Sequence, residues 1–137
     1  MLMEYRANVM DEKQPERIML RSGGKVMLFN ADEIDWIEAS ANYIRIHAGG
    51  RECVVRETMY GIERKLPPGR FVRIHRSIIV NVGRIRQVEP GSSEYILQMH
   101  DGKELPIGRS HRAHVDAVLR SMAGAAAAAS AVDRSRF

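Results

Sequence analysis

The eleven residues Phe71–Asn81, FVRIHRSIIVN, place cationic side chains directly before a run of apolar ones. The side chains suited to contact with an anion are those of Arg73, His75, Arg76 and Ser77. The run that follows them, IIV, is suited to a protein core. A segment of this kind can hold positive groups rigidly against an anion. In a small basic protein that anion is most often a phosphate backbone. The pattern therefore predicts a module that binds DNA in a sequence-specific manner.

The charge of the chain is distributed unevenly. Its 137 residues carry a net charge of +4, and the sequence pI is about 9.6. Residues 70–112 hold eight Lys or Arg side chains against four acidic ones, and three of the five His side chains also lie there. A local surplus of positive charge is typical of a surface that binds nucleic acid. Acidic partner proteins or anionic membranes would suit the same surplus, so charge alone leaves these alternatives open.

The cysteine content and the apolar runs indicate the cellular setting. Cys53 is the single cysteine of the sequence, so an internal disulfide cannot form. No apolar run approaches the length of a membrane span. The N-terminal residues MLMEYRANVMDEK contain acids where a signal peptide needs an apolar stretch. We therefore expect a cytoplasmic protein that makes no contact with a membrane.

Turn-forming residues divide most of the chain into short stretches that read as β-strands. Hairpin turns are expected at Gly23-Gly24, Gly49-Gly50 and Asp101-Gly102. Alternation should place Ile44 and Ile46 on one face of their strand. The stretches expected to be strands are 18–20, 26–29, 34–39, 43–48, 51–56, 84–89, 94–99 and 104–107.

Two helices and three regions are expected along the chain. Thr58 is suited to cap a short helix that runs to Leu66, where Pro67-Pro68 must end it. Ser110 is suited to cap a second helix, whose apolar stripe is Val115, Val118, Leu119 and Met122. We expect a flexible lead-in at residues 1–16, one domain at residues 17–122, and an alanine-rich tail at residues 123–137.

Four stretches, in this order and spacing, resemble the LytTR DNA-binding domain of bacterial transcription regulators. They are IDWIEASANYIRIH from Ile34, RETMYGIERKLPPGRF from Arg56, FVRIHRSIIVN from Phe71 and ELPIGRSHR from Glu104. The resemblance implies a mainly β fold of about ten short strands in small sheets, with one or two short helices and a C-terminal helix. It also implies an unusual docking mode, in which loops enter the DNA grooves in place of a recognition helix.

By the same resemblance, three segments of this chain would contact DNA. They are Ser40-Ala41-Asn42-Tyr43, His75-Arg76-Ser77, and Gly108-Arg109-Ser110 with His111 and Arg112. The family commonly carries a receiver domain of about one hundred residues upstream of the DNA-binding domain. Only the short lead-in precedes the first expected strand here. We therefore expect either a stand-alone regulator or a fragment of a longer protein.

The last of these segments holds the first candidate for reading a base, Arg109. A guanidinium can donate two hydrogen bonds to guanine O6 and N7, which contributes about 1–3 kcal/mol of discrimination. Gly108 has no Cβ and would let the loop approach closely. Ser110 could mark a helix N-terminus whose N–H groups bind a phosphate, and it could also simply cap the helix, because the two roles are compatible. Arg112 could clamp a phosphate, or it could be solvated surface charge.

The other two segments offer weaker or more ambiguous contacts. Arg76 is suited to a phosphate or a base edge, and Ser77 to a phosphate oxygen. His75 is as well suited to orienting its loop through a hydrogen bond as to touching DNA. Asn42 could read adenine N6 and N7, or it could only form a turn. Tyr43 could contact a sugar or a phosphate, or it could cover the sheet.

The sequence therefore predicts a transcription regulator that binds duplex DNA through three loops. Two copies are expected on adjacent repeats, because one small module offers few base contacts. The alternative is a protein-interaction module that pairs with or antagonises a larger regulator. We expect no catalysis, no metal and no cofactor, because the sequence has no nucleophile beside a base, no convincing metal-ligand cluster and no cofactor loop.

Overall fold

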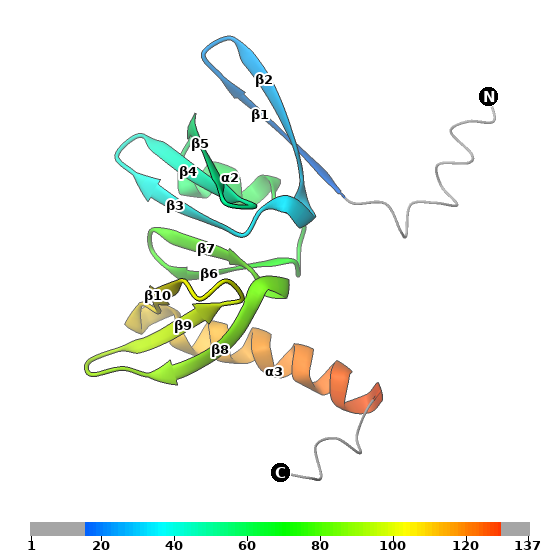
Figure 1. Cartoon of the computed structure of the whole chain (residues 1–137), viewed down its shortest axis with the longest axis vertical. Coiled ribbons are helices and arrows are strands. Elements are labelled where there is room, and N and C mark those ends of the chain that lie inside the picture. Colours follow the sequence, from blue (N-terminus) through cyan, green and yellow to red (C-terminus); the bar gives the residue numbers. More distant parts are fainter. Residues whose placement is uncertain (1–15, 130–137) are drawn as a thin grey trace, which may run out of the picture. The chain divides into compact units, whose positions relative to one another are not determined.

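The computed structural model describes residues 16–129 of the chain, and the side chains of residues 16–122. This part holds ten short strands, two α-helices and three single 3₁₀ turns (Figure 1). It divides into two compact units, whose boundary in the sequence falls between Pro68 and Gly69. The predicted mainly β fold class is confirmed. Most of the predicted lead-in, and residues 130–137 of the predicted tail, lie outside the described residues.

The first unit begins with an antiparallel hairpin of two strands, β1 (Arg17–Ser22) and β2 (Lys25–Asn30). Its turn is the predicted glycine pair: Gly23 and Gly24 have φ of +58° and +80°, which other residues adopt only with strain. A 3₁₀ turn, η1 (Ala31–Glu33), then leads into three antiparallel strands in the order β5-β4-β3. They are β3 (Trp36–Ser40), β4 (Tyr43–Ala48) and β5 (Arg51–Arg56).

Alternation along β4 builds part of the core of this unit. Ile44 and Ile46 are fully buried, whereas Tyr43 is 41% exposed, so the predicted faces of the strand are confirmed. Ile44 lies opposite Val55 of β5, which is also fully buried. The pleat therefore directs these apolar side chains of both strands to one side, and Tyr43 lies on the other.

The helix α2 (Met59–Lys65) begins and ends close to where the sequence predicts. The Thr58 hydroxyl oxygen accepts a hydrogen bond of 2.9 Å from the backbone N–H of Gly61, which confirms the predicted N-cap. Met59 and Ile62 are buried, and Leu66 already has an extended backbone before Pro67-Pro68. Capping, apolar spacing and the proline stop together define this short helix.

The second unit is formed by a hairpin and a separate three-stranded sheet. The hairpin pairs β6 (Phe71–His75) with β7 (Ile78–Asn81) through the two-residue turn Arg76-Ser77. After the 3₁₀ turn η2 (Val82–Arg84), the three strands of the sheet are antiparallel in the order β10-β9-β8. They are β8 (Ile85–Pro90), β9 (Tyr95–Met99) and β10 (Glu104–Pro106).

The chain leaves β10 through the 3₁₀ turn η3 (Arg109–His111) and enters the helix α3 (Arg112–Ala129). The predicted capping of this helix by Ser110 is wrong. Gly108, with extended backbone, precedes η3, and Ser110 lies inside that turn with its hydroxyl 3.3 Å from His111 Nδ1. Because a 3₁₀ turn comes before the helix, α3 starts at Arg112, one residue later than a cap at Ser110 would require.

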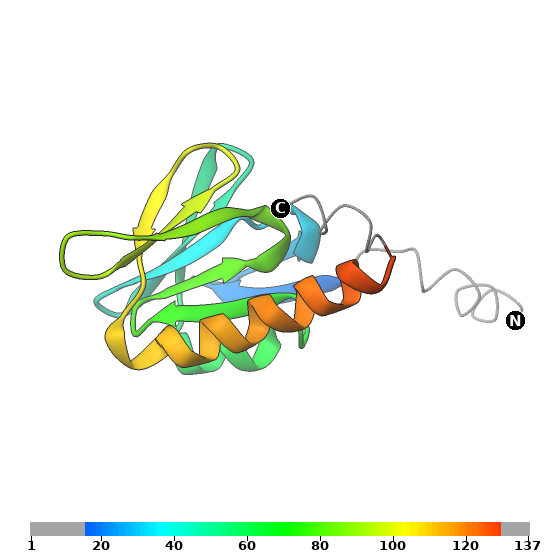
Figure 2. The same cartoon turned by 90° about the horizontal axis from the view of Figure 1, so that it is seen from below.

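The helix α3 runs alongside β6 (Figure 2). Val115 is buried and anchors its apolar stripe, whereas Met122 further along is 41% exposed. The anchored end of the helix is therefore the end that adjoins η3. Within residues 16–129, no helix combines the length and apolar character needed to cross a membrane.

Candidate nucleic-acid interface

Two loops of the second unit lie against each other. The backbone N–H of Gly108 donates a hydrogen bond of 2.7 Å to the carbonyl oxygen of Ile74, near the end of β6. A Cβ on Gly108 would lie 3.4 Å from Cδ2 of His75 and 3.5 Å from its Cα. These are ordinary contact distances, so packing alone does not require glycine at this position. The hydrogen bond ties the start of η3 to the end of β6, next to the β6–β7 turn.

The β6–β7 turn is held from beneath by Arg73. Its guanidinium donates to the carbonyl oxygen of His75 at 3.4 Å and also to the carbonyl oxygen of Arg76. The strand pairing shifts register between Arg73 and His75, which marks a bulge just before the turn. A charged donor that holds two consecutive carbonyls restricts the backbone more firmly than a neutral one. Arg73 thus keeps a positive charge beneath the turn and fixes its shape.

His75 orients the same turn through its ring. Its Nδ1 accepts a hydrogen bond of 3.2 Å from the backbone N–H of Ser77 and lies 3.1 Å from the Ser77 hydroxyl oxygen. A backbone N–H can only donate, so Nδ1 carries no proton in this arrangement and the ring proton is at Nε2. Of the two roles open from the sequence, the geometry supports the loop-orienting one directly. It also fixes the Ser77 side chain.

These supports leave two arginine side chains exposed on adjoining loops. Arg76 lies at the tip of the β6–β7 turn, and Arg109 is the first residue of η3; both are exposed. Arg109 directly follows Gly108, whose backbone is bonded to β6. The backbone of each arginine is therefore held while its guanidinium extends into solvent. Such an arrangement suits a contact with a large anionic partner.

Arg112, at the start of α3, is also held in place. Its guanidinium carbon lies 3.8 Å from the centre of the Tyr95 ring on β9, which is a close cation–π contact. Arg112 itself is exposed. Stacking orients the guanidinium without consuming its N–H donors. A phosphate oxygen could accept hydrogen bonds from those donors.

The first unit carries the other two predicted contact residues, at the turn between β3 and β4. Ser40 pairs with Tyr43, so Ala41 and Asn42 form a two-residue turn. Ala41 has φ of +57° and is the single non-glycine residue with positive φ among the described residues. This conformation costs about 1–2 kcal/mol for a residue with a Cβ. Asn42 is exposed at the tip, presented by a backbone that carries this strain.

We expect replacement of Ala41 with glycine to stabilise the protein by about 0.5–1 kcal/mol, because glycine adopts positive φ without steric conflict. Thermal and urea unfolding would measure the change. Ala39→Gly, in the extended backbone of β3, is the matched control and should lower stability instead. Equal losses in the two variants would mean that the turn is not strained.

The structure thus brings six of the eight predicted contact residues together in the second unit. These are His75, Arg76, Ser77, Arg109, Ser110 and Arg112. Asn42 and Tyr43 belong to the first unit. Reasoning from the sequence missed Tyr95 as the support of Arg112 and Arg73 as the support of the turn. Arg73 could have been found, since its charge lies in the middle of a core-forming strand, but no local signal marks Tyr95.

A comparison with protein-family models identifies the chain. Residues 24–120 match the model described as the LytTr DNA-binding domain. The chain belongs to the LytTR family. The match spans the elements from the β1–β2 turn into α3, and so it includes every predicted contact residue. The resemblance stated from four sequence stretches is confirmed.

Known proteins that are similar to this LytTR chain include a sensory transduction protein and a transcriptional regulatory protein. Sensory transduction protein LytT of Bacillus subtilis is 28% identical over 96 residues, which cover 69% of this chain and 40% of that protein. Transcriptional regulatory protein YpdB of Escherichia coli K12 is 29% identical over 100 residues, which cover 72% of this chain and 41% of that protein. The chain therefore spans about 40% of the length of these curated relatives.

A solved structure supports the fold. The LytTr DNA-binding domain of a Bacillus cereus protein, described as a methyl-accepting/DNA response regulator, superposes with a TM-score of 0.66. It is 23% identical in sequence, and the match covers 77% of this chain and 98% of that one. At this identity the likeness establishes the architecture alone and does not assign roles to individual side chains.

Proposed function

We propose that this chain is the DNA-binding part of a transcription regulator and that it recognises a specific duplex sequence through its loops. The observation that carries the proposal is that hydrogen bonds in the second unit hold the backbone near its exposed arginine residues. Arg76 and Arg109 are exposed on two loops, and a backbone hydrogen bond joins the residue before Arg109 to β6, the strand that ends at the Arg76 turn. Membership of a DNA-binding family adds the class of partner. A preformed cationic surface suits a duplex because little conformational entropy is lost when it binds.

The roles divide between base reading and phosphate binding. Arg109 reads guanine in the major groove through its two parallel donors. Arg76 and Ser77 bind backbone phosphates and set the register of the protein on the duplex. Arg112 clamps a further phosphate from its position on Tyr95. Asn42, at the tip of the β3–β4 turn, reads adenine, and Tyr43 packs beside it on the backbone. No bond is made or broken in this function.

Two copies of the chain are proposed to occupy adjacent repeats. One module has few side chains that can reach base edges, and specific affinity in the usual range requires more contacts. Pairing two modules raises affinity through effective concentration, without any new kind of contact. A site with both repeats should therefore bind much more tightly than a site with one.

Selection from randomised duplex DNA, followed by footprinting, is the experiment that tests this proposal. We expect a tandem repeat in the selected sequences and a protected region that covers both copies. Scrambling one repeat should lower the affinity by roughly 10²-fold, the lower end of the gain expected from pairing two modules. The proposal fails if selection returns no common sequence. A chain that shifts no DNA but co-purifies with a larger regulator would instead support the protein-interaction alternative.

A further inference from the structure

A hollow of about 230 Å³ lies beside the turn of the β1–β2 hairpin, in the first unit. Its lining contains three cationic residues and no acidic one: Arg21, Ser22, Gly23, Gly24, Lys25 and Arg56. The two turn glycines contribute backbone without side chains, so the hollow is open to a group of moderate size. Positive charge without an acid in the lining favours an anion as its occupant.

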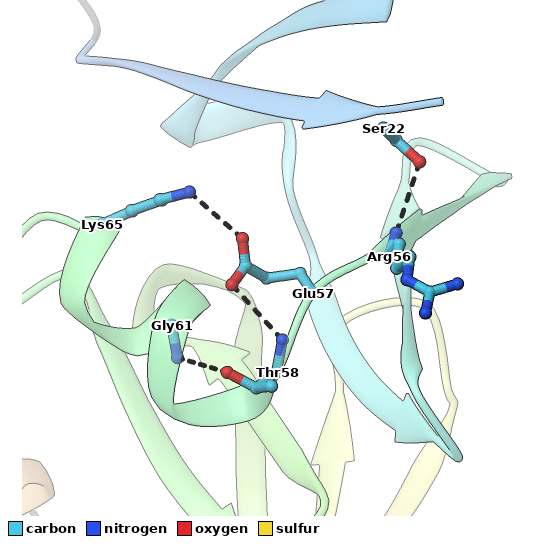
Figure 3. A network of polar contacts seen from close by, with 6 residues as sticks. All are labelled: Ser22, Arg56, Glu57, Thr58, Gly61 and Lys65. Carbon is cyan, nitrogen blue, oxygen red and sulfur yellow. Dashed lines mark hydrogen bonds and ion pairs between the residues drawn. The ribbon is translucent and has the colours of Figure 1, made fainter. Parts of the chain in front are cut away.

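A hydrogen bond joins the two elements that line the hollow, the β1–β2 hairpin and the end of β5. The backbone N–H of Arg56, at the end of β5, donates to the Ser22 hydroxyl oxygen at 3.3 Å (Figure 3). Ser22 pairs with Lys25 across the hairpin. Ser22 lies two residues after the fully buried Leu20, so the two side chains are on the same face of β1. The Ser22 and Lys25 side chains therefore leave the hairpin on its core-facing side, which is also the side on which β5 lies.

Glu57, the acidic residue nearest to Arg56 in sequence, interacts with other residues. Glu57 Oε1 binds the Lys65 ammonium at 3.1 Å, and its Oε2 accepts from the backbone N–H of Thr58 at 3.3 Å. Figure 3 shows the Glu57 side chain directed toward α2, whereas the Arg56 guanidinium points away from it. Within residues 16–129, no ion pair involves the cations of the hollow. No carboxylate of the described residues therefore pairs with these cations.

The hollow also adjoins a proposed DNA-contact turn. Arg56 is the cross-strand partner of Tyr43, and its guanidinium carbon lies 5.9 Å from the centre of the Tyr43 ring. Tyr43 directly follows Asn42 at the tip of the β3–β4 turn. A duplex that placed a base edge against Asn42 would bring its sugar–phosphate backbone past Tyr43 and toward Arg56.

We propose that this hollow is an additional phosphate site, which receives a DNA backbone phosphate flanking the bases read by Asn42. The inference rests on the proposed function, since it assumes that a duplex lies on the β3–β4 turn. Lys25 supplies an ammonium and Arg56 a guanidinium, and the two differ in reach and in donor geometry. The contact carries no sequence information, but it adds affinity and fixes register. Free phosphate shares the same chemistry and is the other source to be tested.

The test compares Lys25→Gln and Arg56→Gln with Arg17→Gln. Arg17 is exposed on the same hairpin, at the end of β1 remote from the turn, so its replacement removes the same charge away from the hollow. All three changes keep the Arg56 backbone bond to Ser22, and thermal unfolding would verify folding. Each hollow variant should reduce the slope of log affinity against log salt by about 0.9, on cognate and scrambled duplex alike. Arg17→Gln should keep the wild-type slope.

Amide chemical shifts of Gly23 and Gly24 would separate the two sources of phosphate. We expect them to shift saturably with cognate duplex and not with inorganic phosphate at an equal phosphate concentration. Saturation by inorganic phosphate, together with unchanged salt slopes, would overturn the DNA assignment. Slopes of the hollow variants equal to that of Arg17→Gln would also overturn it. If wild-type protein still prefers cognate over scrambled duplex in that case, only this inference fails and the proposed function stands.

Discussion

Replacing Arg109 with alanine is expected to lower affinity for the cognate duplex by roughly 5- to 150-fold, the loss of about 1–3 kcal/mol that a bidentate guanine contact contributes. Scrambled duplex should lose little, because Arg109 is assigned to a base and not to the backbone. Exposure of the side chain and the bond from Gly108 to Ile74 support this role. Competition binding on both duplexes, and on a series with one base pair changed at a time, would locate the affected position.

Two further variants define the specificity of that result. Arg109→Lys keeps the charge but loses the two parallel donors, so it should keep non-specific binding and still lose discrimination. Arg120→Ala removes an arginine from the exposed face of α3, where it pairs with Asp116 at 2.8 Å, and should leave binding unchanged. If Arg109→Ala weakens cognate and scrambled duplex by the same factor, Arg109 does not read a base.

Replacing Arg112 with alanine should act differently and weaken all duplex sequences alike. Loss of one phosphate contact is expected to reduce the slope of log affinity against log salt by about 0.9. The guanidinium stacks on the Tyr95 ring, so substitution of Tyr95 tests the same contact independently. Tyr95→Leu removes the stacking surface, worth about 0.5–2 kcal/mol, and should reproduce part of the loss.

Tyr95→Phe is the matched control, because it keeps the aromatic face and removes only the hydroxyl. It should therefore bind DNA as the wild type does. Salt titrations of the three variants on cognate and scrambled duplex would supply the comparison. A sequence-dependent loss in Arg112→Ala would mean that this residue contacts a base. Equal behaviour of the leucine and phenylalanine variants would mean that stacking does not position the guanidinium.

Much of the fold could be predicted because its signals are local. The glycine pairs at positions 23–24 and 49–50, with φ from +58° to +83°, mark turns that few other residues could form. Alternation identified the buried face of β4, and a hydroxyl before a short apolar stripe identified the start of α2. Each of these features depends on the geometry of a few consecutive residues, which the sequence displays directly.

Features of the candidate site were missed where they depend on contacts between distant segments. Tyr95 and Arg112 lie on different elements, and their stacking has no periodicity that a sequence could show. The Ser110 cap was predicted from a residue type that suits a helix start, but the chain inserted η3 first. The strained φ of Ala41 was also hidden, because alanine gives no sign that a turn will force it into the left-handed region.

The hydrogen bond from the Ser77 amide to His75 limits what the imidazole can recognise. With its one lone-pair nitrogen engaged inside the turn, the ring can offer a partner only an N–H. It can therefore meet a phosphate oxygen or a purine N7, but it has no acceptor for an exocyclic amino group. Coordination of a transition metal through Nε2 would require the other tautomer and would remove the hydrogen bond from the Ser77 amide. The imidazole therefore already has a structural role in the turn before any ligand binds.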